Sequence, residues 1–306
     1  MSRIAAVFAG QGAQAVGMGR DLAESNPECK DLFQRANDAL GFDLAKICFE
    51  GPDTDLTKTN IAQPAIFVVS AACLAALRAR KPGFEFDIAA GLSLGEWTAL
   101  YAAGVVSFEQ TVRILEARGR FMQEACDEQA GGMVSVMRLT IEQIQGIAQQ
   151  AGLTMANINS AEQIVLSGAK EGVAAAEAAV KAAGGRAVVL NVAGAYHSPL
   201  MASAAVRLKD VLAGETFQVP DVPVLSNVTG KPHGGPDAIR DAMVAQVTGS
   251  VRWLDSIQWC GANGVERYVE FGPGKILSGL IKRIAPAATA LNVADAASAD
   301  ATAVAL

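Results

Sequence analysis

Apolar and polar positions in the first half of the chain follow two alternating patterns. Short apolar runs at 4–8 and 86–90 are typical of buried strands. Longer segments with helical spacing cover 61–79 and the stretch from the capping residue Ser107 to about Cys126. Strands that alternate with helices favour a parallel sheet with helices on its faces. The pattern therefore predicts an α/β fold.

The pattern changes between residues 129 and 197. Segments there follow the order β-α-β-β-α-β, which is that of a ferredoxin-like unit. They are 132–137, a helix that Thr140 caps, 153–158, 163–167, 173–183 and 186–192. We therefore predict a larger, α/β-hydrolase-like subdomain with a parallel sheet, residues 1–128 and 198–306, and an inserted, smaller ferredoxin-like subdomain, residues 129–197.

The last third of the chain returns to alternating helices and strands. The predicted segments are a helix from Leu200, a strand at 222–227, a helix at 238–246, a strand at 267–270, a helix after Gly272–Lys275 and a last strand at 290–293. These segments complete the larger subdomain.

Composition narrows the class of protein. The net charge of −6 disfavours nucleic acid as a partner. The five cysteines are scattered without C-x-x-C spacing, which predicts free thiols in a reducing cytoplasm and no metal site. No apolar run approaches the roughly 20 residues that span a bilayer. Met1 to Ile4 lead directly into a strand, so we expect no leader peptide and no membrane association.

Ser93 lies in a G-x-S-x-G sequence, Gly91 to Gly95, between a predicted strand and a predicted helix. In this context the pattern is typical of a nucleophile elbow, a tight turn that lifts a serine hydroxyl toward the backbone amides of a helix N-terminus. Chance alone also produces such patterns in glycine-rich turns. The flanking strand and helix favour the nucleophile.

The chain has only two histidines that could act as a base for this serine. His197 precedes Ser198-Pro199, which predicts a loop before a helix, where functional side chains are often displayed. His233 lies in a glycine- and proline-rich turn that we expect to be solvated. His197 is therefore the better base, although a single histidine more often packs or caps. In an ordinary α/β-hydrolase the histidine comes near the C-terminus, whereas about a hundred residues follow His197.

Arg118 is predicted to point into the protein. Its helical neighbours are all apolar: Ile114, Leu115, Phe121 and Met122. A buried guanidinium needs an anion. That anion is either a structural carboxylate, Glu96 or Glu270, or a substrate carboxylate bound in bidentate fashion. The second alternative indicates a substrate with an acyl carbon and a free carboxylate, as in malonate esters.

Gln11 lies in a glycine-flanked turn after the first predicted strand. Such turns face the crevice at the carboxyl edge of a parallel sheet, and the glycines permit the close backbone approach that an oxyanion hole requires. The alternative is an ordinary strand-to-helix turn. The third glycine of a dinucleotide-binding loop is missing.

Together these segments resemble the motif series of malonyl-CoA:acyl carrier protein transacylases. The matching segments are Phe8–Gln14, Gln63-Pro64-Ala65, Gly91–Glu96, Arg118-Gly119, Gly194–His197 and Glu270–Gly274. The resemblance implies a ping-pong transfer in which Ser93 takes malonyl from malonyl-CoA and passes it to the phosphopantetheine thiol of acyl carrier protein. No cofactor or metal is expected, and the protein is expected to be a cytoplasmic monomer.

The resemblance also assigns roles to individual residues. It implies an oxyanion hole from the backbone amides of Gln11 and Leu94, and substrate binding by Arg118 and Gln63. A main-chain carbonyl near Ser250–Arg252, assigned to Arg252, is expected to orient His197. The family often has histidine in place of Leu92 and glutamine in place of Arg252, and an Arg252 side chain in the pocket would add an anion contact.

Two other functions compete with this interpretation. One is a serine hydrolase that acts on acyl thioesters, and the other is a non-catalytic docking component of a larger synthase. For carrier-protein docking, the sequence suggests the basic residues Arg186, Lys275, Lys282 and Arg283. Whether the product feeds fatty acid or polyketide synthesis is not decided by these motifs.

Overall fold

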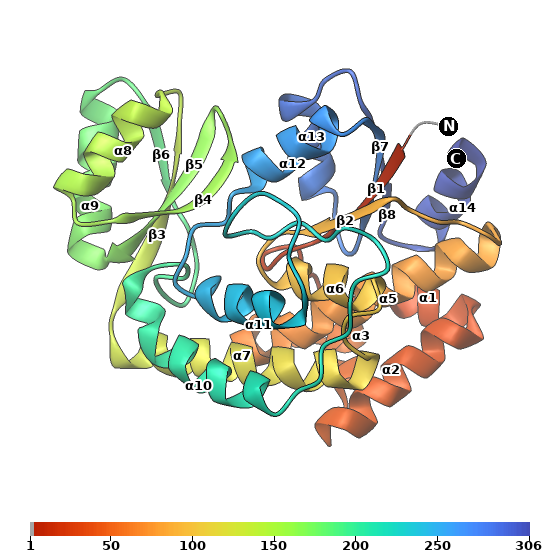
Figure 1. The fold of residues 1–306 in the computed structure, drawn as a ribbon. Coiled ribbons are helices and arrows are strands. Elements are labelled where there is room, and N and C mark those ends of the chain that lie inside the picture. The colour runs from red at the N-terminus through yellow and green to blue at the C-terminus, as the bar shows by residue number, and fades with distance from the viewer. Residues whose placement is uncertain (1–2) are drawn as a thin grey trace.

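The computed structural model describes residues 3–306 and contains two separate sheets with helices packed on them (Figure 1). The larger sheet is parallel and has the order β2-β1-β7-β8. Its strands are β1 (Arg3–Phe8), β2 (Ile88–Gly91), β7 (Val265–Phe271) and β8 (Thr289–Val293). Residues 5–8 of the central strand β1 are fully buried, because helices cover both faces of the sheet.

The helices of this larger unit fall into two stretches of the chain. The first stretch holds α1 (Arg20–Ser25), α2 (Pro27–Leu40), α3 (Leu44–Glu50), α4 (Asp53–Leu56), α5 (Thr59–Arg80), α6 (Leu94–Ala102) and α7 (Phe108–Glu128). The second holds the 3-10 turn η1 (Pro199–Met201), α10 (Ala202–Ala213), α11 (Pro236–Ala245), α12 (Trp253–Ala262), α13 (Ile276–Ile284) and α14 (Ala296–Ala305).

Helix α5 corrects the expectation that no apolar segment approaches the length needed to span a bilayer. By length and composition it could cross a membrane, but 94% of its most apolar window is buried inside the protein. It packs against α2, α7 and α14, so its apolar surface faces other helices. Its composition is therefore that of a central core helix.

The smaller sheet is antiparallel and has the order β4-β5-β3-β6, with two helices on one face (Figure 1). Its elements are β3 (Gly131–Met137), α8 (Ile141–Gln150), β4 (Thr154–Ser160), β5 (Gln163–Ala169), α9 (Lys170–Ala182) and β6 (Arg186–Val189). A separate hydrophobic cluster that includes Val134, Ile144 and Leu166 fills the space under the helices. This confirms the predicted α/β class with a separate ferredoxin-like unit.

The predicted strand at 222–227 is wrong. The segment makes only isolated bridges, from Val224 to Ala89 and from Leu225 to Pro232. The backbone of Asn227 instead contacts other parts of the chain, since its amide donates to Glu96 and its carbonyl accepts from the amide of Arg252. The segment therefore runs beside β2 only at Ala89 and turns away at Asn227, so it does not form a regular strand.

Candidate active site

Ser93 occupies the turn between β2 and α6 in a strained conformation, with φ 54° and ψ −108°. The flanking glycines are required by close packing. A Cβ on Gly91 would lie 1.9 Å from the carbonyl carbon of Gly95, and a Cβ on Gly95 would lie 2.2 Å from the carbonyl oxygen of Phe8. The turn therefore has the backbone geometry of a nucleophile elbow.

The hydroxyl of Ser93 is 2.8 Å from Nε2 of His197. The other ring nitrogen, Nδ1, lies 2.8 Å from the carbonyl oxygen of Gln246 and 3.1 Å from that of Gly249. Since carbonyl groups only accept, Nδ1 carries the proton and Nε2 is free to accept the serine proton. Burial, with a smaller effect from the charge of Arg118, lowers the pKa of His197 to about 4. The imidazole is therefore neutral at physiological pH, as a base must be.

The carbonyl groups that orient His197 differ from the predicted one. The carbonyl of Arg252 accepts from the amide and hydroxyl of Ser256 instead, because Arg252 caps the N-terminus of α12. The side chain of Arg252 pairs with Asp255 at 2.5 Å and is half exposed. It does not line the pocket.

The side chain of His233 is buried, contrary to the prediction of a solvated turn. Its amide donates to the carbonyl of Val224, which folds the turn back onto the protein. Its ring nitrogen Nε2 then lies 2.6 Å from a carboxylate oxygen of Glu96, and both side chains are almost fully buried.

Arg118 points inward, as predicted, and its side chain is 1% exposed. One terminal nitrogen donates to Oε1 of Gln63 at 2.6 Å, and the other donates to Oε1 of Gln246 at 3.0 Å and to the hydroxyl of Ser93 at 3.2 Å. Among the described residues, Nε has no hydrogen-bond partner. Burial lowers the pKa of Arg118 to about 10, and the charge of Glu96 opposes that shift. The guanidinium stays charged beside the serine.

Neither candidate carboxylate contacts this guanidinium directly. Glu270 accepts from the amides of Leu277 and Ser278 at 2.9 and 2.7 Å, at the N-terminus of α13. Glu96 bonds to His233, to Gln246 and to a backbone amide. The guanidinium therefore has only neutral hydrogen-bond partners, and one of them is the hydroxyl of Ser93.

Gln63 lies behind the arginine. Its side chain is fully buried, and its amide nitrogen is 3.6 Å from the sulfur of Met122. Helices α5 and α7 approach closely here, since a Cβ on Gly119 would lie 2.4 Å from the carbonyl oxygen of Thr59. Gln63 does not line the pocket, so it holds Arg118 from behind.

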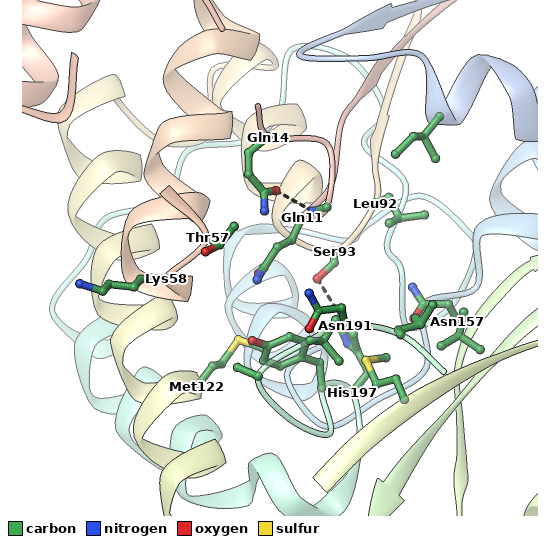
Figure 2. A pocket seen from close by; sticks show the side chains of 18 of the residues that line it. Gln11, Gln14, Thr57, Lys58, Leu92, Ser93, Met122, Asn157, Asn191 and His197 are labelled. Carbon is green, nitrogen blue, oxygen red and sulfur yellow. Dashed lines mark hydrogen bonds between the residues drawn. The ribbon is translucent and has the colours of Figure 1, made fainter. Parts of the chain in front are cut away.

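A cavity of about 730 Å³ opens above Ser93. Figure 2 shows Gln11 extending into it beside Ser93, with Asn191 near Ser93 and His197, Met122 below, and Asn157 on the side of the smaller sheet. Gln11 follows β1, and Leu94 is the first residue of α6, where backbone amides lack acceptors within the helix. Among residues 3–306, no group of three or more histidine, cysteine or acidic side chains is arranged to hold a metal ion.

Sequence reasoning missed two residues that hold the elbow. Oδ1 of Asn227 accepts from the amide of Ser93 at 2.7 Å, and Nε2 of Gln246 donates to the carbonyl of Ser93 at 2.9 Å. The signal for Gln246 was available, because it is a polar residue in the apolar run Met243–Val247. It is the same kind of signal that identified Arg118.

Comparisons with known proteins agree with this geometry. The family model described as acyl transferase domain matches residues 6–298. The malonyl CoA-acyl carrier protein transacylase of Escherichia coli strain K12 is 43% identical over 295 residues, which is 95% of each chain. That of Bacillus subtilis strain 168 is 39% identical over 290 residues, covering 93% of this chain and 91% of the relative.

Solved structures show the same relationship. The malonyl CoA-acyl carrier protein transacylase of Clostridium perfringens superposes with a TM-score of 0.94 at 39% identity, covering 98% of this chain and 96% of that one. A malonyl-transacylase in complex with its type II polyketide synthase acyl carrier protein has a TM-score of 0.94 at 40% identity, with 97% and 98% of the chains covered. This chain therefore belongs to the acyl transferase domain family, as a member of its malonyl-CoA:acyl carrier protein transacylases.

Proposed function

We propose that this chain transfers malonyl groups from malonyl-CoA to the phosphopantetheine thiol of acyl carrier protein through a malonyl ester on Ser93. The observation that carries the proposal is a buried, charged Arg118 without a carboxylate partner, 3.2 Å from a serine hydroxyl that is bonded to a neutral histidine. The product supplies fatty acid or polyketide synthesis.

In the first half-reaction, Nε2 of His197 accepts the proton of Ser93 while the serine oxygen attacks the thioester carbonyl. The backbone amides of Gln11 and Leu94 stabilise the resulting oxyanion. When the intermediate collapses, the carbon–sulfur bond breaks and the thiolate of coenzyme A takes the proton from His197. The carbonyls of Gln246 and Gly249 hold the imidazole in the required tautomer throughout.

In the second half-reaction, the thiol of acyl carrier protein gives its proton to His197 and attacks the malonyl ester. The serine oxygen leaves and recovers that proton. Arg118 pairs with the malonyl carboxylate in both steps, which selects a carboxylated acyl group. One chain provides every residue of this scheme, so we propose a monomer that needs no cofactor. The five free cysteines support the proposed cytoplasmic location.

For carrier-protein docking, we propose the exposed basic residues Arg186, Lys275, Lys282 and Arg283. Arg186 on β6 and Arg283 on α13 both line an open groove where the proposed subdomain 129–197 meets the larger one. An acidic carrier protein binds such a surface with strong salt dependence. Reversing the charge of Arg186 and Arg283 should raise KM for the carrier protein and flatten its salt dependence, and an unchanged salt dependence would refute this surface.

One experiment tests the function as a whole. The protein is incubated separately with malonyl-CoA and acetyl-CoA, and intact masses are measured, with Ser93→Ala as control. We expect a stable single malonyl adduct on the wild type, little acetyl adduct, and neither on the variant. A thioesterase would instead release malonate rapidly without carrier protein. A non-catalytic docking protein would form no adduct and would not react with a fluorophosphonate at Ser93.

A further inference from the structure

A buried ionisable pair lies behind the elbow, and the transfer scheme does not use it. Nε2 of His233 is 2.6 Å from Oε1 of Glu96, and the side chains are 2% and 1% exposed. His233 follows the turn after 222–227, and Glu96 is in the first turn of α6. Burying a carboxylate this deeply is costly unless it has a specific set of partners.

Glu96 has three such partners. Besides His233, its other oxygen accepts from Nε2 of Gln246 at 2.6 Å and from the amide of Asn227 at 3.1 Å. An ionised carboxylate only accepts hydrogen bonds, so it dictates that Gln246 turns its nitrogen toward Glu96. The carboxamide oxygen of Gln246 must then face the opposite way, where it accepts from Arg118.

The same carboxamide links the arginine to the nucleophile. Nε2 of Gln246 also donates to the carbonyl of Ser93, while the side chain of Asn227 binds the amide of Ser93 and the carbonyl of Gly91. Glu96 thus fixes Gln246 by accepting from its side-chain amide, and it fixes Asn227 by accepting from its backbone amide. Together they hold both backbone groups of the strained serine.

Glu96 is also the carboxylate whose negative charge raises the pKa of Arg118 against the effect of burial. The carboxamide of Gln246 separates this carboxylate from the guanidinium, so the two charges interact without a direct ion pair. A direct pair would have to be broken before a malonyl carboxylate could bind. A counter-charge held behind Gln246 balances the buried arginine and leaves it without a carboxylate in direct contact.

We propose that Glu96, held by His233, is a positioning residue that supplies the counter-charge of Arg118 through Gln246 and fixes the elbow of Ser93. The charge coupling through Gln246 is independent of the proposed function, whereas its consequence for malonyl binding rests on that function. Both levels can be tested separately.

The first test measures coupling without any substrate. In Glu96→Gln, the new side-chain amide can donate a hydrogen bond to the ring of His233, which then acts as the acceptor. The substitution therefore removes the negative charge and keeps the hydrogen bonds. We expect it to lower the thermal unfolding midpoint by roughly 5 °C, and by much less in an Arg118→Gln background. Arg120→Gln is the matched control, since Arg120 lies on the exposed face of α7 and pairs with Glu116. If Glu96→Gln lowered the unfolding midpoint equally in the wild-type, Arg118→Gln and Arg120→Gln backgrounds, the proposal would be overturned.

The second test separates electrostatics from a structural role. Without the negative charge, the site is more positive, so Glu96→Gln should lower KM for malonyl-CoA about threefold and leave the inhibition constant of unacylated coenzyme A unchanged. A parallel change of both constants, or none, would refute the role in malonyl binding. If the wild type forms no malonyl adduct at all, the proposed function fails. The unfolding measurements need no substrate, so they still test the charge coupling between Glu96 and Arg118.

His233 is tested by a pair of variants. His233→Leu removes the donor to Glu96, whereas His233→Gln keeps a nitrogen donor on a side chain of similar reach. We expect the leucine variant to lose at least about tenfold in kcat/KM for malonyl transfer and the glutamine variant to recover most of it. Wild-type transfer by the leucine variant would exclude a positioning role for His233.

Discussion

The floor and one wall of the pocket are built on different principles. In the floor, around and behind Ser93, the side chains of Glu96, Gln246, Asn227 and His197 are buried, and each is hydrogen-bonded to the others or to the elbow. The wall comes from the smaller sheet and from residues 190–193, which follow it. There Asn191 is exposed, and the buried Oδ1 of Asn159 has no partner among the described residues.

This difference indicates a division of labour. The floor is pre-organised, so the reacting groups need little rearrangement when the charge develops. The wall is less completely hydrogen-bonded, since Oδ1 of Asn159 has no partner among the described residues. The two regions are joined where Val251 donates to the carbonyl of Ala156 and accepts from the amide of Ile158 on β4. Val251 lies two residues after Gly249, whose carbonyl faces His197.

The floor should be far more sensitive than the wall to substitution. His197→Ala removes the base and should slow formation of malonyl-Ser93 about a thousandfold, because general base catalysis typically contributes a factor of this size. Rapid quenching followed by intact mass measurement gives the rate. A loss of less than tenfold would show that water or another group serves as the base.

The pH dependence of stability should also come from the floor. The pKa of His197 is about 4 in the folded protein, against an ordinary value of 6.5. Between these values the unfolded chain binds a proton that the folded one does not, so stability falls as pH decreases from 6.5 toward 4, by at most about 3 kcal/mol. Urea unfolding of wild type and His197→Gln across this window isolates the effect. Parallel curves would contradict a buried neutral histidine.

Arg118 is expected to control selectivity rather than nucleophilicity. Arg118→Ala should reduce the preference for malonyl-CoA over acetyl-CoA by about a hundredfold, since the buried ionic contact to the carboxylate is lost. Single-turnover rates with both thioesters provide the measurement, and Arg120→Ala on the exposed face of α7 is the control. Unchanged selectivity would remove Arg118 from the malonyl site.

The elements that a local pattern encodes could be predicted from the sequence. The elbow needs small residues at 91 and 95, and Arg118 interrupts an apolar helical face, so both leave a trace in a single sequence. The β-α-β-β-α-β unit is likewise visible in its periodicity. Each of these features depends on neighbours along the chain.

The contacts that could not be predicted from the sequence join segments that are far apart along the chain. The carbonyls facing His197 come from Gln246 and Gly249 instead of Arg252, because the cap of α12 uses the carbonyl of Arg252. His233 was expected to be solvated, since nothing near it in the sequence indicates that Glu96 lies opposite. A buried polar network of this kind depends on tertiary structure, which hydrophobic periodicity does not describe.

The smallest expected effect concerns the wall. Asn159→Ala removes a free acceptor at the pocket, so it should raise KM for malonyl-CoA about threefold to tenfold, the cost of one neutral hydrogen bond. The rate of malonyl-Ser93 formation at saturation should not change, because Oδ1 of Asn159 makes no hydrogen bond to the floor within residues 3–306. Exposed Glu171 on α9, which does not line the cavity, offers Glu171→Ala as a control for the smaller subdomain. If Asn159→Ala lowered the saturating rate as strongly as His197→Ala, the wall would take part in the chemistry and the division between the two regions would be wrong.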